Sequence, residues 1–281
     1  MTPEFKEKID GSSSALEWEL HSIFEKMEKM EKKPVETRKL THCLGLAGTQ
    51  QQDVAEIFYL LLNKLGSENV KKVFEATVTK TIECEACHTR QRDEPGDRLL
   101  LLPLSFYSHD RQSRIESVND GLRNFLYKKT LSGDDMAFCD ICKSKKPATL
   151  VQEFTCLPPV LVFQLKRFEY NPLRGFTKIH HSIKIPWTLD VPLSSPNESK
   201  SYHLFSRCEH HGNVSGGHYT ALIKSTSIEQ LYRCSDETVT PWTDPHESEE
   251  KEDLWSTETY LLMYRQRSTD RYVFSTLQPF P

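Results

Sequence analysis

The chain has 281 residues, of which 37% are hydrophobic and 27% charged, and its formal net charge is -4. This length allows one large domain or two small ones with a sizeable core. The acidic balance argues against nucleic acid as the main partner. The N-terminal sequence lacks a signal-peptide pattern, and no apolar run approaches the ~20 residues of a membrane helix. We therefore expect a cytoplasmic and/or nuclear protein without membrane contact.

Three stretches have the apolar spacing of helices, and each follows a capping box of the Ser/Thr-x-x-Glu/Gln type. The predicted helices and their capping pairs are 15–32 (Ser14, Glu17), 50–65 (Thr49, Gln52) and 114–127 (Ser113, Glu116). Gly66 follows the second helix, where a left-handed C-cap is expected. The exposed start of that helix is Gln51-Gln52-Asp53. This cluster either caps and solvates the helix or faces a bound chain.

From residue 70 onward the pattern changes to short alternating segments that predict strands. The clearest predicted strands are 99–104, 149–156, 160–168, 202–210, 217–224, 231–234 and 259–265. Helices followed by many strands predict an α+β protein, with a mostly antiparallel sheet in the second half. The acidic run from Asp244 to Asp253 predicts a solvated loop.

Four of the eight cysteines form two C-x-x-C pairs, Cys84 with Cys87 and Cys139 with Cys142. Two such pairs can supply the four thiolates of a tetrahedral zinc site. Four thiolates leave no position for water, so we expect a structural zinc rather than a catalytic one. A redox pair or a chance pairing is the alternative. The remaining cysteines (Cys43, Cys156, Cys208 and Cys234) have no such spacing.

Gly216-Gly217-His218-Tyr219 begins a predicted strand with a histidine beside two glycines. Glycines let another backbone approach closely, and an imidazole exchanges protons near neutral pH. His218 is therefore a candidate general base, although an edge-strand histidine without a catalytic role has the same local pattern. The adjacent pairs His180-His181 and His210-His211 lack a metal-like partner set, and we expect them at the surface.

Six motifs, some of them described above, follow one another along the chain in a recognisable order. They are Gln51-Gln52-Asp53-x-x-Glu56, the two C-x-x-C pairs, Leu161-Val162-Phe163-Gln164-Leu165-Lys166-Arg167-Phe168, Gly216-Gly217-His218-Tyr219, Cys234-Ser235-Asp236-x-x-Val239-Thr240 and Thr259-Tyr260-Leu261-Leu262-Met263-Tyr264-Arg265. In this order they resemble the ubiquitin-specific protease family of cysteine deubiquitinases, and most closely its ubiquitin carboxyl-terminal hydrolase 47-like branch.

The resemblance implies a papain-like fold with thumb helices, an antiparallel palm sheet and fingers that carry the zinc cysteines. It implies one catalytic domain over residues 1–267, with the thumb in 1–68, fingers and palm in 69–267, and a C-terminal tail in 268–281. It also implies a cleft between thumb and palm for the ubiquitin tail. The residues implied there are Gln51, Gln52, Asp53, Gly216, Gly217 and Tyr219.

The resemblance gives His218 the role of the base that deprotonates a nucleophilic cysteine, but no matching cysteine segment is found. The family has this cysteine in an Asn-x-Gly-x-x-Cys-Tyr-Leu-Asn-Ser type segment, and nothing in residues 1–50 resembles it. We therefore expect a thumb that lacks its first segment and a chain without the nucleophile. Cys43 has neither an upstream asparagine nor a helix beginning at it, which argues against it as a replacement.

A second departure concerns the residue that orients His218. The family has Asn or Asp where this chain has Ser235, and the next residue, Asp236, matches a family aspartate. A hydroxyl accepts a hydrogen bond from imidazole but stabilises an imidazolium less than a carboxylate does. Because neighbouring strand residues point to opposite faces, we expect only one of the two to face His218.

Three functions are compatible with these sequence features. The first is a thiol-dependent hydrolase that cleaves the bond after the C-terminal glycine of ubiquitin or a ubiquitin-like modifier. The second is a catalytically inactive protein of the same fold that binds this modifier, and the third is an unrelated zinc module that binds nucleic acid. We favour the first, with a monomeric chain and ubiquitin or its conjugates as partners.

Overall fold

The computed structural model describes residues 2–9, 11, 14–29, 34–46, 50–173, 175–195, 197–225, 230–242 and 253–267. Within these ranges, the N-terminal helices and two main sheets, one of five strands and one of eight, form an α+β fold, as predicted. None of the helices in these ranges has the length and apolar character to cross a membrane. The predicted tail 268–281 and all but the last residue of the predicted acidic loop lie outside the described residues.

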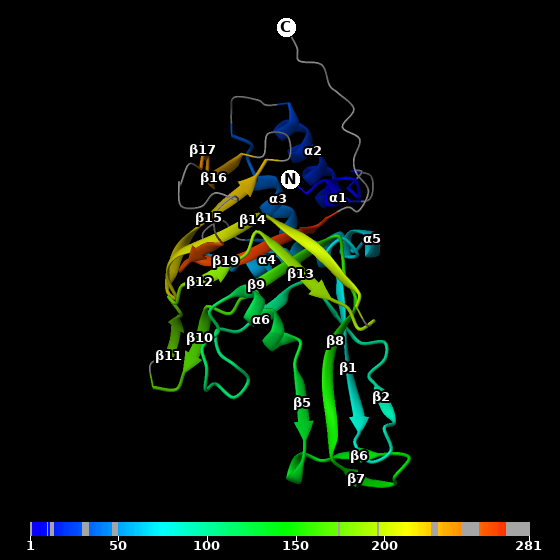
Figure 1. The fold of residues 1–281 in the computed structure, drawn as a ribbon. Coiled ribbons are helices and arrows are strands. Elements are labelled where there is room, and N and C mark those ends of the chain that lie inside the picture. The colour runs from blue at the N-terminus through cyan, green and yellow to red at the C-terminus, as the bar shows by residue number, and fades with distance from the viewer. Residues whose placement is uncertain are drawn as a thin grey trace.

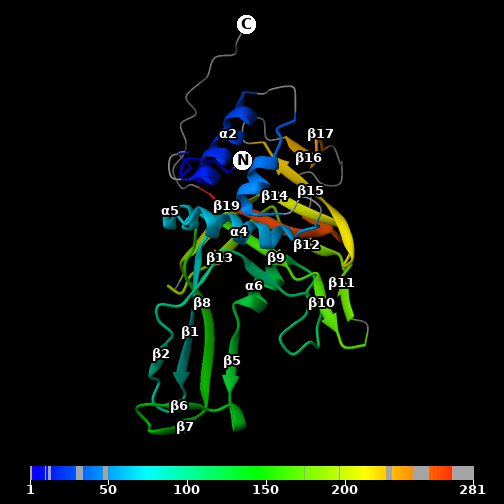
Figure 2. The ribbon, with the colours of Figure 1, turned by 180° about the vertical axis from the view of Figure 1, so that it is seen from behind.

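The N-terminal helices, which we call the thumb, lie against one face of the large sheet (Figure 2). They are α1 (Pro3–Lys6), α2 (Ala15–Glu28), α3 (Arg38–Leu44), α4 (Val54–Leu65) and α5 (Glu68–Lys71). Ser14 caps α2 as predicted, because its Oγ accepts a hydrogen bond from the amide of Glu17 at 3.1 Å. Gly66 ends α4 in the left-handed conformation, also as predicted. The short helix α3 was missed by the apolar spacing.

The predicted capping box of the second helix is wrong. The N-cap of α4 is Asp53, whose Oδ1 accepts hydrogen bonds from the amides of Ala55 at 2.7 Å and Glu56 at 3.4 Å. Its other carboxylate oxygen accepts the hydroxyl of Tyr260 at 2.6 Å. A carboxylate with this second partner is a stronger cap than the predicted Thr49, which lies outside the described residues.

The strands that extend away from the thumb form the fingers (Figure 1). They are β1 (Ala76–Cys84), β2 (Arg90–Arg92), β3 (Asp97–Leu99), β5 (Lys128–Leu131) and β8 (Ala148–Cys156), with the small hairpin of β6 (Ala137–Cys139) and β7 (Ser144–Lys146) at the tip. A short 3-10 helix, Gly133–Asp135, precedes this hairpin. β1 pairs with β8 along its whole length, which brings the two C-x-x-C pairs to the same end of the fingers.

The palm is an eight-stranded sheet in the order β17-β16-β15-β14-β19-β9-β4, with β13 also paired to β14. Its strands are β4 (Leu102–Leu104), β9 (Val160–Leu165), β13 (Thr188–Pro192), β14 (Ser199–Asn213), β15 (Gly216–Lys224), β16 (Leu231–Ser235), β17 (Thr238–Pro241) and β19 (Thr259–Gln266). All pairs except β4 with β9 are antiparallel, in agreement with the prediction. A second layer contains α6 (Val118–Phe125), β10 (Phe168–Asn171), β11 (Gly175–Lys178), β12 (Ile183–Ile185) and β18 (Leu254–Ser256).

The core has two parts, on the two faces of the palm sheet. Along β9, Val160 and Val162 face the thumb, whereas Leu161, Phe163 and Leu165 face the layer of α6 and β12. This alternation is the two-residue period of a strand whose faces are both covered.

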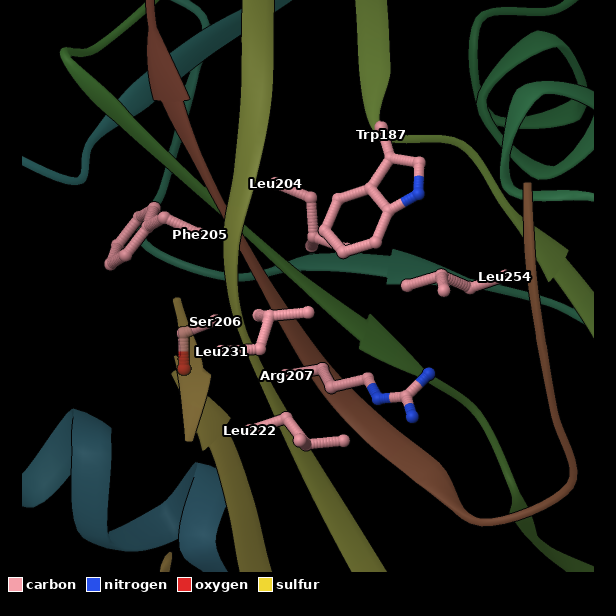
Figure 3. A pocket seen from close by; sticks show the side chains of 8 residues that line it. All are labelled: Trp187, Leu204, Phe205, Ser206, Arg207, Leu222, Leu231 and Leu254. Atoms are coloured by element: carbon pink, nitrogen blue, oxygen red, sulfur yellow. The ribbon is translucent and has the colours of Figure 1, made fainter. Parts of the chain in front are cut away.

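A cavity of about 10 Å³ lies beside β14 and holds at most a single water (Figure 3). It is lined by Trp187, Leu204, Phe205, Ser206, Arg207, Leu222, Leu231 and Leu254.

Several element boundaries differ from the prediction, among them the following three. The predicted strand 99–104 is two strands, β3 and β4, which belong to different sheets. The predicted strand 160–168 is likewise interrupted between β9 and β10. Helix α6 begins at Val118 after Ser117, not after Ser113, because tertiary hydrogen bonds hold residues 114–117 extended. The amide of Ile115 donates to the carbonyl of Phe106, and the amide of Lys184 to that of Glu116.

Arg167 interrupts the strand and joins four backbone segments. Its side chain is fully buried and donates hydrogen bonds to the carbonyls of Thr259, Ile179, His181 and Ser256 at 2.5 to 3.0 Å. The guanidinium also lies 4.8 Å from the ring centre of Phe106. Burial lowers the pKa of Arg167 to about 10, which still leaves it charged at neutral pH. Arg167 therefore fixes the turns at the ends of β9, β11, β12 and β18.

We predict that Arg167→Met destabilises the protein by about 3 kcal/mol or more, because it leaves several buried carbonyls without a donor. Urea denaturation followed by circular dichroism measures this change. Arg123→Met is the matched control, since Arg123 is 79% exposed and pairs only with Asp120 in α6. The control should change stability by less than about 0.5 kcal/mol. An equally small change for Arg167→Met would contradict the role assigned to it.

Candidate functional site

His218 is the third residue of β15, at the end where β15 meets β14. It lies opposite His211 in the register, and Gly217 lies opposite Gly212. A Cβ atom on Gly212 would approach the carbonyl oxygen of Gly216 to 2.5 Å, and one on Gly217 would collide with His210. Gly212 also has a φ of 134°. These glycines therefore allow the two strands to approach closely beside His218.

Ser235 and Asp236 both lie beside the ring of His218. The Nε2 atom of His218 is 2.9 Å from Ser235 Oγ and 3.9 Å from Asp236 Oδ2. Ser235 ends β16, and Asp236 begins the turn to β17 with a φ of 48°. Only Ser235 forms a hydrogen bond with His218. Strand alternation alone would point the Asp236 carboxylate away, but the turn places it near the same nitrogen.

The geometry of the pair determines which nitrogen of His218 is available for proton transfer. When Nε2–H donates to Ser235 Oγ, Nδ1 carries the lone pair. Nδ1 makes no hydrogen bond with the described residues, and the side chain is 47% exposed. His218 can therefore accept a proton at Nδ1 from a group that enters from the solvent side.

A cleft of about 300 Å³ lies between the start of α4 and the glycine-rich end of β14 and β15. Five of the six residues implied for the ubiquitin-tail cleft line it: Gln51, Gln52, Asp53, Gly216 and Tyr219. Gly217 is not among the lining residues. It instead forms two hydrogen bonds with Gln51, whose Nε2 donates to the Gly217 carbonyl at 3.1 Å and whose Oε1 accepts the Gly217 amide at 3.0 Å.

The start of α4 is held in place against the palm by buried polar contacts. Gln164 on β9 donates to the hydroxyl oxygen of Tyr260 at 2.7 Å, and this hydroxyl donates to Asp53. Burial, together with the charge of Asp53, raises the pKa of Tyr260 far above its usual value, so the hydroxyl keeps its proton. Asp53 therefore serves as a helix cap and a contact between thumb and palm at once.

Sequence reasoning missed half of the cleft. Its remaining lining residues are Phe168, His210, Asn213, Val214 and Ser215. The expectation that His210 lies at the surface is wrong, because it is only 5% exposed and packs against the rings of Phe168 and Tyr219. Burial and the charge of Lys178 lower the pKa of His210. The two-residue period of β14 could have indicated this burial, because it places His210 on the same face of the strand as Cys208.

None of the eight cysteines, all of which lie in described ranges, hydrogen-bonds to His218. Cys234 lies next to Ser235 but pairs with Ala221 in the sheet, and burial raises its pKa. Burial also raises the pKa of Cys208 to about 12. A nucleophilic cysteine needs the opposite shift, so neither thiol is prepared for attack.

The two C-x-x-C pairs meet at the tip of the fingers. Cys84 ends β1 and Cys139 ends β6, while Cys87 and Cys142 lie in the turns that follow. All four Sγ atoms lie within 4.8 Å of one another. Thiolates at ~2.3 Å from a tetrahedral zinc are ~3.8 Å apart, so the cluster fits a four-thiolate metal site with only small adjustments. The amide of Cys142 donates to Cys139 Sγ at 3.5 Å.

Comparison with known proteins agrees with the fold. The model of the family described as ubiquitin carboxyl-terminal hydrolase matches residues 2–264. Ubiquitin carboxyl-terminal hydrolase 51 of Mus musculus is 28% identical, over 94% of this chain and 46% of its own length. Ubiquitin carboxyl-terminal hydrolase 22 of Homo sapiens is 27% identical, over 92% of this chain and 59% of its own length. Ubiquitin carboxyl-terminal hydrolase 47 of Drosophila melanogaster is 24% identical, over 96% and 24%.

Solved structures give the same fold. A chain of the SAGA Ubp8/Sgf11/Sus1/Sgf73 DUB module bound to ubiquitin aldehyde superimposes with a TM-score of 0.68 and 26% identity, over 83% of this chain and 54% of that one. A related module bound to monoubiquitin gives a TM-score of 0.67 and 27% identity. This chain spans about half the length of the curated relatives that it matches first.

These findings confirm the resemblance deduced from the motifs, including the thumb, palm and fingers arrangement. The chain belongs to the ubiquitin carboxyl-terminal hydrolase family and has the ubiquitin-specific protease fold.

Proposed function

We propose that this chain is the ubiquitin-binding, histidine-bearing part of a cysteine-type deubiquitinase. The reaction is hydrolysis of the isopeptide or peptide bond after the C-terminal glycine of ubiquitin or a ubiquitin-like modifier. The observation that carries this proposal is the hydrogen-bonded pair of His218 and Ser235, with His218 on the strand whose Gly216 and Tyr219 line the cleft. The related DUB modules bound to ubiquitin aldehyde and monoubiquitin support ubiquitin as the partner.

The cleft suits an extended tail of small residues. Its sides are glycine backbone from β15 and the amide side chains of Gln51 and Gln52, which can donate to and accept from a peptide backbone. The aromatic rings of Phe168 and Tyr219 line it as well. A tail that enters can exchange hydrogen bonds with the Gln51 side chain, which in the free chain bonds to Gly217. We propose that Gln51 binds the tail in this way.

His218 has the role of base and then acid in this proposal. Its Nδ1 takes the proton of a cysteine thiol, and the resulting imidazolium gives this proton to the amine that leaves. Ser235 orients the ring through Nε2, and Asp236 adds negative charge at 3.9 Å. A neutral hydroxyl supports the imidazolium less than a carboxylate bonded directly to the ring would.

The nucleophile in this proposal is none of the eight cysteines in these 281 residues. Four of them form the cluster at the tip of the fingers, and Cys234 and Cys208 are held as thiols. Cys43 lies in α3 of the thumb, and Cys156 is exposed at the end of β8. The proposal therefore requires a thiol from a further segment of the protein. If no such segment exists, the protein binds ubiquitin without cleaving it, and Ser235 in place of a carboxylate favours this second function.

We further propose that the four-cysteine cluster binds a structural zinc ion. Cys84, Cys87, Cys139 and Cys142 would hold it and join the ends of β1 and β6. The metal would supply folding free energy to the fingertip hairpin, where few apolar side chains are buried. With four sulfur ligands it takes no part in the hydrolysis.

The tail cleft predicts that ubiquitin binding depends on the glycine pair at the ubiquitin C-terminus. Removing this pair should weaken binding to the 281-residue chain by at least about tenfold, since the cleft contacts are then lost. Isothermal titration calorimetry with intact and shortened ubiquitin measures the difference. Equal affinities would show that the cleft is not the tail site.

The nucleophile proposal predicts that ubiquitin with a C-terminal thiol-reactive electrophile forms no adduct with the 281-residue chain. The native protein isolated from its source should form one and should hydrolyse ubiquitin amides. His218→Ala in the native sequence should then lower hydrolysis by roughly 10²-fold or more. An adduct on one of the eight cysteines would contradict the proposal. Binding without an adduct by the native protein would establish the second function instead.

The zinc proposal predicts one zinc ion per chain after purification without chelator. Cys139→Ser should abolish the bound zinc, because three thiolates leave the tetrahedral site incomplete. It should also increase proteolysis between β5 and β7. Cys156→Ser is the matched control, since Cys156 is exposed and lies at the end of β8 opposite to the cluster, and it should keep one zinc ion. Metal analysis by mass spectrometry that finds no zinc in the unmutated chain would contradict the proposal.

A further inference from the structure

Lys178, the last residue of β11, has a buried charged group next to the candidate site. Its side chain is only 1% exposed. Nζ donates to the carbonyls of His210 and Gly212, the latter at 3.3 Å, and forms an ion pair with Glu258. The three groups come from the end of β14 and from the turn between β18 and β19. Burial of an ammonium group is unfavourable unless it is paired and hydrogen-bonded, and these three contacts meet that requirement.

Glu258 contacts the same segment a second time. Its backbone carbonyl accepts the amide of His210 at 2.9 Å. Burial would raise the pKa of Glu258, but the hydrogen bond and charge of Lys178, with His180 and His211, lower it below its ordinary value. The carboxylate therefore stays ionised beside the ammonium. Both backbone polar groups of His210 are thus bonded by the Lys178–Glu258 pair.

Beyond Glu209, the segment held by this pair is paired in the sheet with β15 but no longer with β19. Gly212, Gly216 and Gly217 have no side chains, and residues 214–215 form the exposed turn between β14 and β15. Glycines lose the most conformational entropy on ordering, so such a turn needs contacts from neighbouring elements. Gln51 supplies one from the thumb, through Gly217. Lys178 supplies the other, through His210 and Gly212, from the opposite side.

We propose that Lys178, paired with Glu258, is a positioning residue that fixes the end of β14 and so sets the cleft and the placement of His218. That the cleft binds ubiquitin rests on the proposed function. The effect of Lys178 on the geometry of the cleft does not. His211 lies opposite His218 in the strand pair, and His210 packs on Gly217, so a shift of this segment moves the histidine directly. Lys178 does not itself line the cleft, and it acts through the backbone carbonyls of His210 and Gly212.

The test compares Lys178→Met, which keeps the length of the side chain and removes its charge and donors, with Lys184→Met. Lys184 pairs with Asp253 in the same layer but is 44% exposed. Amide hydrogen exchange followed by mass spectrometry should show exchange at least about tenfold faster over residues 210–218 in Lys178→Met. Peptides of β9 and α4 should keep their protection, and Lys184→Met should leave all regions unchanged. Unchanged exchange over 210–218, or an equal increase across the whole palm, would overturn the proposal.

Ubiquitin affinity provides the second readout. Lys178→Met should weaken ubiquitin binding at least about threefold, and Lys184→Met should not, because loosening the cleft costs ordering entropy on binding. If the unmutated chain does not bind ubiquitin, the proposed function fails, while the exchange result still decides the role of Lys178.

If Lys178→Met does not fold, Glu258→Gln replaces it, since it keeps the shape of the Glu258 side chain and removes its charge. Glu258→Gln should show a smaller increase confined to the same residues, and no such increase would overturn the proposal.

Discussion

The candidate site depends on the antiparallel pairing of β14, β15 and β16. This register places His211 opposite His218, and Ala221 opposite Cys234, so that the end of β16 brings Ser235 to the imidazole. A shift of one residue would turn Ser235 to the other face of the sheet. The glycines at the end of β14 and β15 then leave room for a bound chain at the same place. Strand register thus determines both the chemistry and the shape of the site.

The thumb and the palm contribute to the site through a few polar contacts between them. Asp53 caps α4 and accepts the hydroxyl of Tyr260, and Gln51 bonds to both backbone groups of Gly217. On the other side Lys178 and Glu258 bond to His210 and Gly212. The cleft is therefore positioned from two sides by groups that satisfy backbone donors and acceptors, and the apolar cores below it supply stability.

Much of this arrangement follows from the sequence, because its causes are local. The two-residue period predicted β9, β14, β15 and β19, and the spacing of cysteines predicted a cluster that the fold does bring together. The order of motifs predicted the family. Local capping rules were less successful, since Thr49 and Ser113 were chosen where Asp53 and Ser117 are the caps. In both cases tertiary hydrogen bonds decided the boundary.

The residues that the sequence did not reveal act over long distances in the chain. His210 was expected at the surface, yet it is buried against Phe168 and Tyr219 in the cleft. Lys178 lies 80 residues before Glu258, and no local pattern connects the two. Arg167 donates to four backbone carbonyls that lie up to 92 residues away in the chain. Such partners become visible only when the strand order is known.

The measurement that tests this account most directly is photo-cross-linking from the ubiquitin tail. A photoreactive residue placed close to the ubiquitin C-terminus should label peptides that contain residues 51–53 and 213–216, which line the two sides of the cleft. Peptides from the tip of the fingers should remain unlabelled by the tail. Labelling elsewhere on the chain, or labelling that excess unmodified ubiquitin does not compete away, would contradict the claim that this cleft binds the tail.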